Sequence, residues 1–290
     1  MTTLDSLRWD IRQRLMYLEA RVIWTGHVAP ADLRETFGVS VAQADKDFAL
    51  YQEQSPDNLL PDDKGGAYVA SDRFEPRLLR GSAQEFLLVL RNHGLKAGAP
   101  DSPLAALLGG IAPAEVIERP EREFDVRILQ RVTAAIREKR WLVVEYQSMT
   151  HPEPRPLLLA PHALASAGRW HLRAWSQTHN GYRDFLLARI SGIPELKGAC
   201  EKNAQDDWDW RNFVNVKVGA HPGLTPPQKR VIEADYGMHS GVLERAVRVA
   251  LVPYYLQMLG LNRESSSLSP AEQPLTLLNR SELEVYNRFS

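Results

Sequence analysis

The sequence lacks the features that mark secreted, membrane-spanning and disulfide-bonded proteins. It has one cysteine, Cys200, among 290 residues, which excludes a disulfide within the chain and suits a reducing cytoplasm. It has no basic stretch followed by an apolar run near its N-terminus, and no run of 18 apolar residues. We therefore expect neither a signal peptide nor a membrane span, and a cytoplasmic location.

The common catalytic signatures are also missing. The sequence contains no GxSxG, GxxxxGK[ST], GxGxxG or HExxH motif, which argues against the hydrolases, nucleotidases and dehydrogenases that depend on them. His151, His162, His171 and His179 lie close together, but their spacing matches no zinc site, and Cys200 has no activating partner nearby in sequence. We predict no catalytic residue, no metal and no cofactor.

Charge is distributed unevenly although the net charge is only −1. Residues 127–200 hold eleven Lys and Arg against five Asp and Glu, whereas residues 1–80 hold ten against thirteen. The basic middle segment indicates an anionic ligand there. The first segment, by contrast, has a small acidic excess.

The first 75 residues have the pattern of a winged helix. Apolar residues at helical spacing predict a helix over 9–24, and a short helix over 30–37 is joined by FGVS to a longer one. Ser40 is a suitable N-cap for that longer helix. The sequence DKGG at 63–66, between apolar flanks, predicts the hairpin of a wing.

In a winged helix the second helix of the motif enters the major groove and reads bases. The alternative is that the polar residues here are simply solvated. The acidic excess of residues 1–80 predicts only modest affinity for random DNA, because phosphate contacts supply most non-specific affinity. The candidates to offset this excess are Arg8, Arg12, Arg14 and Arg21 of the first helix. The predicted DNA-binding residues are Ser40, Gln43, Lys46 and Asp47 on the reading helix, with Thr25, Arg34, Lys64, Tyr68 and Arg73 contacting phosphates.

Beyond residue 75 the pattern changes twice. Residues 76–125 are predicted to form a helical linker, with a helix over Ala83 to Asn92 and a loop over Gly94 to Pro103. A further helix is expected from about Val126 to Lys139. Several short strands close together predict a small, strongly bent sheet or barrel. The strands are expected at 141–148, 155–164, 169–176 and 182–190.

Cations and aromatics concentrate in the predicted hairpin 168–190, GRWHLRAWSQTHNGYRDFLLARI. Strand alternation puts His171 and Arg173 on one face, and we expect pairing to bring them beside Arg183 and Arg189, with Asp184 facing away. Such a cluster needs an anion to offset its repulsion. Arginine forks suit phosphate and aromatic faces suit bases. Solvation, or pairing with acids from elsewhere, remains the alternative.

The C-terminal part is predicted to be mixed. A strand is expected over Asn212 to Gly219, followed by a helix capped by Thr225 with Pro226 at its first position. A second helical stretch is expected from about Val242 to Leu261, with Pro253 kinking or interrupting it.

The motifs RWHLRAW and GYRDFLLARI, after VEYQS and LAPHAL, resemble the WYL domain. The triplet that names this domain is here Trp170-His171-Leu172, which departs at its middle position. The layout as a whole resembles bacterial WYL transcriptional regulators, in particular repressors beside phage-defence operons such as BREX and CBASS. The resemblance implies an α+β multidomain fold, with a winged helix-turn-helix (1–75), a linker (76–125), a WYL domain with an Sm-like small β-barrel (126–200) and a C-terminal α/β dimerisation extension (201–290).

The resemblance also implies a function. It predicts a homodimeric repressor that binds double-stranded DNA at an inverted-repeat operator and senses an anionic nucleotide or nucleic-acid ligand through its WYL domain. A nucleotide- or RNA-processing enzyme and an RNA-binding module remain alternatives for the same basic pocket. The family's ligand positions fall on Tyr146, Ser148, His162, Arg173, Arg183 and Arg189, with Arg155 and Phe185, and the strand pattern adds His171.

Overall fold

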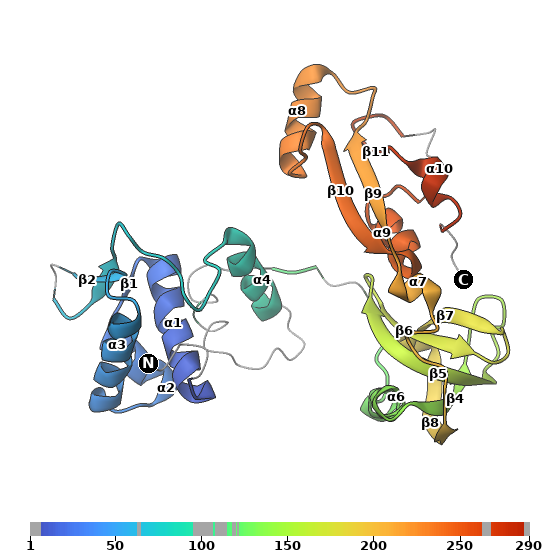
Figure 1. Ribbon diagram of the computed structural model, residues 1–290, viewed down its shortest axis with the longest axis horizontal. Coiled ribbons are helices and arrows are strands. Elements are labelled where there is room, and N and C mark those ends of the chain that lie inside the picture. Colours follow the sequence, from blue (N-terminus) through green and yellow to red (C-terminus); the bar gives the residue numbers. More distant parts are fainter. Residues whose placement is uncertain are drawn as a thin grey trace. The chain divides into compact units, whose positions relative to one another are not determined.

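The computed structural model describes residues 7–62, 65–94, 107, 115–117, 120, 122–262 and 268–286. The chain divides into two compact units, Met1–Glu118 and Arg119–Ser290 (Figure 1). Among the described residues, the first unit has one hydrophobic core and the second unit has two. Among the described helices, none combines the length and apolarity needed to cross a membrane.

The first unit contains a winged helix-turn-helix, as predicted. Its three helices surround a core that includes Leu15, Leu33 and Phe48, and Ser40 caps the third helix by accepting the backbone N–H of Gln43 at 3.2 Å. The wing is a three-stranded antiparallel sheet of order β1-β3-β2. The elements are α1 (Trp9–Thr25), β1 (His27–Val28), α2 (Pro30–Phe37), α3 (Val41–Gln54), β2 (Leu59–Pro61), β3 (Tyr68–Ala70) and α4 (Ala83–Gly94).

A buried carboxylate joins α1 to the chain that follows the wing. Glu19 has no exposed surface, and its two oxygens accept the backbone N–H groups of Arg77, Leu78 and Leu79 at 2.8–2.9 Å. The hydroxyl of Tyr51 on α3 donates to the same carboxylate at 2.8 Å. Four donors therefore satisfy the buried charge, which is otherwise costly to remove from water.

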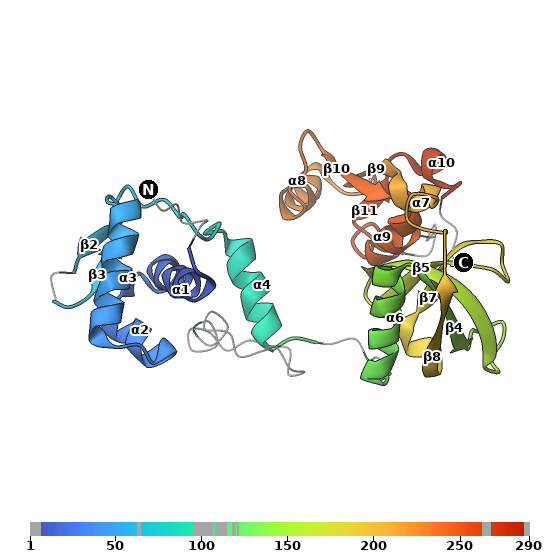
Figure 2. The same cartoon turned by 60° about the horizontal axis from the view of Figure 1, so that its bottom comes forward.

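The second unit begins with a helix that covers one face of an antiparallel five-stranded sheet (Figure 2). Ile128, Val132 and Ala135 of this helix pack against sheet residues that include Leu142 and Leu159. The elements are α6 (Val126–Glu138), β4 (Arg140–Tyr146), β5 (Arg155–Ser166), β6 (Trp170–Ser176), β7 (Gly181–Leu186), the 3₁₀ helix η2 (Leu187–Arg189) and β8 (Ile190–Ala199).

The sheet is open, so the predicted Sm-like barrel is not observed. The strand order β7-β6-β5-β4-β8 leaves β7 and β8 as edges within residues 122–262. The predicted strand 182–190 is broken by η2, which turns the chain from one edge to the other. Two hydrogen bonds join this part of the chain to the end of β4: Leu186 N–H donates to the Tyr146 hydroxyl at 3.1 Å, and Gln147 N–H donates to the Arg189 carbonyl at 3.2 Å.

The C-terminal part has a three-stranded antiparallel sheet of order β10-β9-β11. The predicted strand and the helix after Thr225 are both present, and Gln228 accepts the Thr225 backbone N–H at 2.9 Å in a capping box. The elements are α7 (Trp208–Arg211), β9 (Phe213–Ala220), α8 (Pro226–Asp235), β10 (Val242–Arg248), η3 (Val249–Leu251), α9 (Val252–Met258), β11 (Leu275–Leu277) and α10 (Arg280–Leu283).

The helix predicted over 242–261 was wrong for its first half. Residues 242–248 form β10, which pairs with β9 along its whole length. Gly241, at φ +77°, lies just before this strand, in a backbone conformation that favours glycine. Pro253 lies in the first turn of α9, where its missing N–H has no intrahelical acceptor to lose.

Candidate functional site

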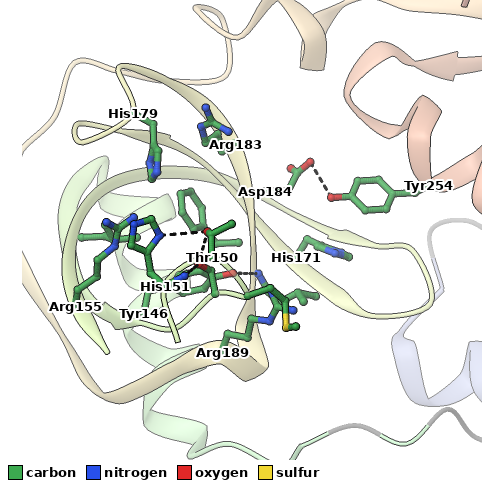
Figure 3. Close-up of a pocket in the computed structure, with 15 residues that line it drawn as sticks. Tyr146, Thr150, His151, Arg155, His171, His179, Arg183, Asp184, Arg189 and Tyr254 are labelled. Atoms are coloured by element: carbon green, nitrogen blue, oxygen red, sulfur yellow. Dashed lines mark hydrogen bonds between the residues drawn. The ribbon is translucent and has the colours of Figure 1, made fainter. Parts of the chain in front are cut away.

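A cavity of about 380 Å³ lies between the end of β4, the loop after it, β7, η2 and α9 (Figure 3). Seven of the nine predicted ligand residues line it: Tyr146, Ser148, Arg155, His171, Arg183, Phe185 and Arg189. The sequence analysis did not assign eight other lining residues to the site: Met149, Thr150, His151, Leu157, His179, Asp184, Leu186 and Tyr254.

Three arginines of this cavity have no acidic partner. Arg155 comes from β5, Arg183 from β7 and Arg189 from η2, and within the described residues none of the three side chains makes an ion pair or a hydrogen bond. Two of these cations affect a neighbouring histidine. Burial lowers the pKa of His179, and the charges of Arg183 and Arg155 lower it further. The cavity is therefore lined by three guanidinium groups that no carboxylate of the described residues pairs, although the Asp184 carboxyl group also lies in its wall.

Part of the wall of the cavity is aromatic. The rings of Tyr146 and Phe185 meet edge to face, with centroids 5.2 Å apart, and both side chains are buried. The Tyr146 hydroxyl is held in place by the Leu186 backbone N–H. Opposite β7, Ser148 Oγ accepts the His151 N–H at 3.0 Å and lies 3.0 Å from the Thr150 hydroxyl (Figure 3). Hydroxyl groups and an aromatic wall thus accompany the cations.

Arg173 and His162 do not line this cavity. For Arg173 the reason is that the predicted hairpin register was wrong. Strand β6 pairs with β7 so that Arg173 lies opposite Asp184, and Ala174 lies opposite Arg183. Directly paired residues share a face of the sheet, so Arg173 faces Asp184 and is separated from Arg183. The alternation within β6 was predicted correctly, but alternation alone does not set the register between two strands.

Arg173 instead joins the five-stranded sheet to the C-terminal part through buried carboxylates. Its Nε and Nη2 donate to the two oxygens of Asp207 at 2.8 and 3.0 Å, and its Nη1 donates to Asp184 at 3.4 Å. Asp209 lies 3.6 Å from Nη2. His162 Nε2 lies 2.9 Å from the same Asp207 carboxylate. The side chains of Arg173 and Asp207 are 5% and 1% exposed, so no free guanidinium remains here for a ligand.

The carboxylates of this network differ in their acidity. Burial alone would raise the pKa of Asp207, but hydrogen bonds from His162 and Arg173 outweigh it and hold the pKa at about 2. Burial raises the pKa of Asp184, and the opposing effects of Arg173 and Tyr254 are smaller. Asp207 is thus firmly ionised, and it also caps α7 by accepting the Trp210 N–H at 3.2 Å.

Tyr254 on α9 brings the C-terminal part to the cavity. Its hydroxyl donates to Asp184 Oδ2 at 3.1 Å, and its ring lies 4.7 Å from that of His171, centroid to centroid (Figure 3). Burial, followed by the Asp184 charge, raises the pKa of Tyr254, so the hydroxyl stays protonated and keeps donating. Nothing in the local sequence around Tyr254 indicated this contact.

The predicted DNA-binding residues are divided by the structure. Ser40, Lys46, Arg34 and Arg73 are exposed, and Gln43 is half-buried. Lys64 lies outside the described residues. The Thr25 hydroxyl is used within the fold, donating to the Arg21 carbonyl at 2.6 Å.

The roles predicted for Asp47, Arg14 and Arg21 need correction. Asp47 was predicted to be exposed and to face DNA, but it is 1% exposed and bonds to Arg14. Arg14 is therefore unavailable to offset the acidic excess, and Arg21 is paired with Asp32 at 3.1 Å. Glu19 and Asp47 are both buried, so two of the acidic residues counted in segment 1–80 do not contribute to its surface charge. The ring of Tyr68 packs on Phe48 with centroids 5.1 Å apart.

Family models match the chain in three places. They are the BrxR transcriptional regulator winged helix-turn-helix domain at residues 10–92, the WYL domain at 127–194, and the BrxR transcriptional regulator C-terminal dimerization domain at 213–283. Together with the fold, these matches define a DNA-binding regulator of transcription with its own dimerization domain.

Curated relatives extend this over the full length. The DNA-binding transcriptional repressor CapW of Stenotrophomonas maltophilia is 34% identical over 98% of this chain and 94% of its own length. The CapW repressors of Escherichia coli and Pseudomonas aeruginosa are 34% and 33% identical, each over 96% of this chain and 92% of their own length. The chain therefore belongs to the CapW family of DNA-binding transcriptional repressors, and it is a regulator rather than an enzyme.

Proposed function

We propose that this repressor binds a small anionic ligand in the cavity of its WYL domain, and that the bound ligand controls its hold on the operator. One observation carries the proposal: Arg155, Arg183 and Arg189 meet at one cavity without a carboxylate partner among the described residues. Cations that line one cavity without carboxylate partners repel one another, and a bound anion offsets that repulsion.

The lining favours a nucleotide or the end of a nucleic acid as the ligand. Arginine forks bind phosphate oxygens bidentately, and the wall formed by Tyr146 and Phe185 suits a base or a sugar face. A volume of about 380 Å³ lies within the range of small-molecule sites. Arg173 and His162 are left out of the proposed ligand set, because both are committed to Asp207.

The route from the cavity to the dimerization domain is proposed to run through Asp184 and Tyr254. These two residues line the cavity and bond to each other from different domains. An anion held by Arg183 places negative charge beside the Asp184 carboxylate and so weakens the state in which Tyr254 is bound there. A ligand acts in this way only if its affinity differs between two arrangements of the chain.

For DNA binding, we propose that a dimer binds an inverted repeat, because two-fold symmetry in the protein matches a palindromic site. We propose that this site lies in the promoter of a phage-defence operon and that the protein acts in the cytoplasm. Asp47 is excluded from the proposed contacts. The residues proposed to contact DNA are Ser40, Gln43 and Lys46 for bases, with Thr25, Arg34, Lys64, Tyr68 and Arg73 for the backbone.

The test uses the full-length protein and a duplex carrying its own promoter. Mobility shifts are recorded with inorganic phosphate, nucleoside monophosphates, dinucleotides and short single-stranded oligonucleotides as additives. We expect one of these to change operator binding in the wild type but not in Arg183→Ala or Arg189→Ala, which should still bind the operator. Arg131→Ala is the matched control, because Arg131 is exposed on α6 and away from the cavity.

Two results would overturn the proposal. One is an unchanged response to the active additive in both cavity variants, which would place the sensing site elsewhere. The other is tight binding of single-stranded RNA with no operator binding, which would make the chain an RNA-binding module.

A further inference from the structure

The reading helix α3 carries a buried ion pair beneath its exposed face. Asp47 is 1% exposed, and its carboxylate accepts from Arg14 Nε at 2.6 Å and Nη2 at 3.3 Å. Arg14 lies on α1, is itself 7% exposed, and also donates to Asp10 at 3.4 Å. A carboxylate held in this way is fixed within the domain.

Gln43 connects this pair to the surface. It lies one turn before Asp47, is half-buried, and donates from Nε2 to Asp47 Oδ1 at 2.9 Å. Its backbone N–H is held by the N-cap Ser40 at 3.2 Å. An ionised carboxylate only accepts hydrogen bonds, so the Gln43 amide must turn its NH₂ group toward Asp47. The reverse orientation would set an amide oxygen against a carboxylate.

The fixed amide has a consequence for base reading. One Nε2 hydrogen is used by Asp47, which leaves Oε1 and the second hydrogen for DNA. Adenine offers an acceptor at N7 and a donor at N6, whereas guanine offers two acceptors at N7 and O6. An amide held with Oε1 outward matches adenine and opposes guanine O6. An amide free to rotate can present its NH₂ group to guanine instead.

We infer that Asp47 is a positioning residue for DNA readout: with Arg14, it holds the Gln43 amide so that α3 selects adenine over guanine at one position of each half-site. The inference rests on the proposed function only in placing Gln43 at a base.

The experiment uses the full-length protein and a preferred duplex selected from a randomised library. Competitive binding then gives the relative affinity for every single base-pair change. The wild type should prefer adenine over guanine at one half-site position by roughly 5- to 150-fold, the range of a bidentate contact. Gln43→Ala should lose that preference and keep the others.

The decisive variant removes the buried pair but keeps Gln43. Arg14→Met with Asp47→Leu replaces two buried charges by apolar side chains of similar size, a change that folds often tolerate. We expect it to lose most of the adenine preference at the same position. Asp47→Asn, which keeps the side-chain size, should reduce that preference as well. Asp45→Asn is the control, because it removes a charge from an exposed position of the same helix and should leave the profile unchanged.

Each failure has a distinct signature. If Gln43→Ala loses the preference while both Asp47 variants retain it in full, Gln43 reads its base without Asp47 and the inference is wrong. If the wild type binds specifically and Gln43→Ala changes no position, Gln43 contacts no base, and the inference fails together with that premise. A purely structural role for Asp47 would lower all affinities alike and leave the ratio unchanged.

Discussion

Arg173 and Arg183 lie on adjacent strands of one hairpin, and the structure predicts opposite consequences for losing them. Arg173→Met should strongly destabilise the protein. Removing one partner of a buried ion pair costs about 3–5 kcal/mol. Asp207 keeps its bonds from His162 and the Trp210 N–H, so we expect the lower end, about 3 kcal/mol. Arg183→Met should change stability by less than about 0.5 kcal/mol, because Arg183 has no partner to lose.

The assay is thermal unfolding of the full-length protein followed by tryptophan fluorescence. Five of the seven tryptophans lie in Arg119–Ser290, so the signal reports mainly on this unit. For a unit of this size, about 3 kcal/mol corresponds to a fall of about 6–12 °C in Tm. The Arg183→Met variant is the matched control. Equal, small shifts in both variants would refute the reasoning that Arg173 is held by the carboxylates and Arg183 is free.

Three further predictions follow from other buried or crowded groups. The pKa of Asp207 is lowered to about 2 from 3.8, which corresponds to about 2 kcal/mol of folding stability that is present above pH 4 and lost as pH falls toward 2. The difference in unfolding free energy between wild type and Asp207→Asn should therefore shrink between pH 5 and 3. A difference that stays constant over this range would contradict the prediction. Glu19→Gln should destabilise the first unit by about 3 kcal/mol, because an amide NH₂ group would face backbone N–H donors. An unchanged unfolding profile of the first unit would show that the buried carboxylate is dispensable. Arg183→Met should raise the pKa of His179, since a neighbouring cation is removed, and NMR titration of the imidazole measures this; an unmoved value would mean that the cations are not clustered.

Local signals accounted for most of the elements but not for their partners. Ser40 and Thr225 marked helix starts correctly, because N-cap chemistry acts within a few residues. The partner of Arg173 was missed because Asp207 lies 34 residues further along the chain, and no periodicity connects them. The stretch 242–261 was predicted to be helical, with a kink or interruption at Pro253, because short apolar runs do not distinguish a strand from a helix.

Some of what was missed had a readable signal. Asp47 lies three residues after Ala44 and four before Tyr51, on the face that those buried residues define. A charged residue on a buried face requires a partner, and Arg14 on the preceding helix was available. For Tyr254, by contrast, only the folding of the C-terminal part against β7 brings its hydroxyl to Asp184.

The account depends on three guanidinium groups forming an anion site that governs the operator. The most direct measurement titrates the full-length protein with nucleoside monophosphates and short single-stranded oligonucleotides by calorimetry, and follows operator occupancy in the same samples. We predict that one of these anions binds the wild type and alters occupancy, and that Arg189→Met weakens its binding by roughly 10- to 150-fold, the contribution of one hydrogen bond to a charged group. Binding that is unchanged in Arg189→Met, or an anion that binds there without any effect on occupancy, would contradict the account.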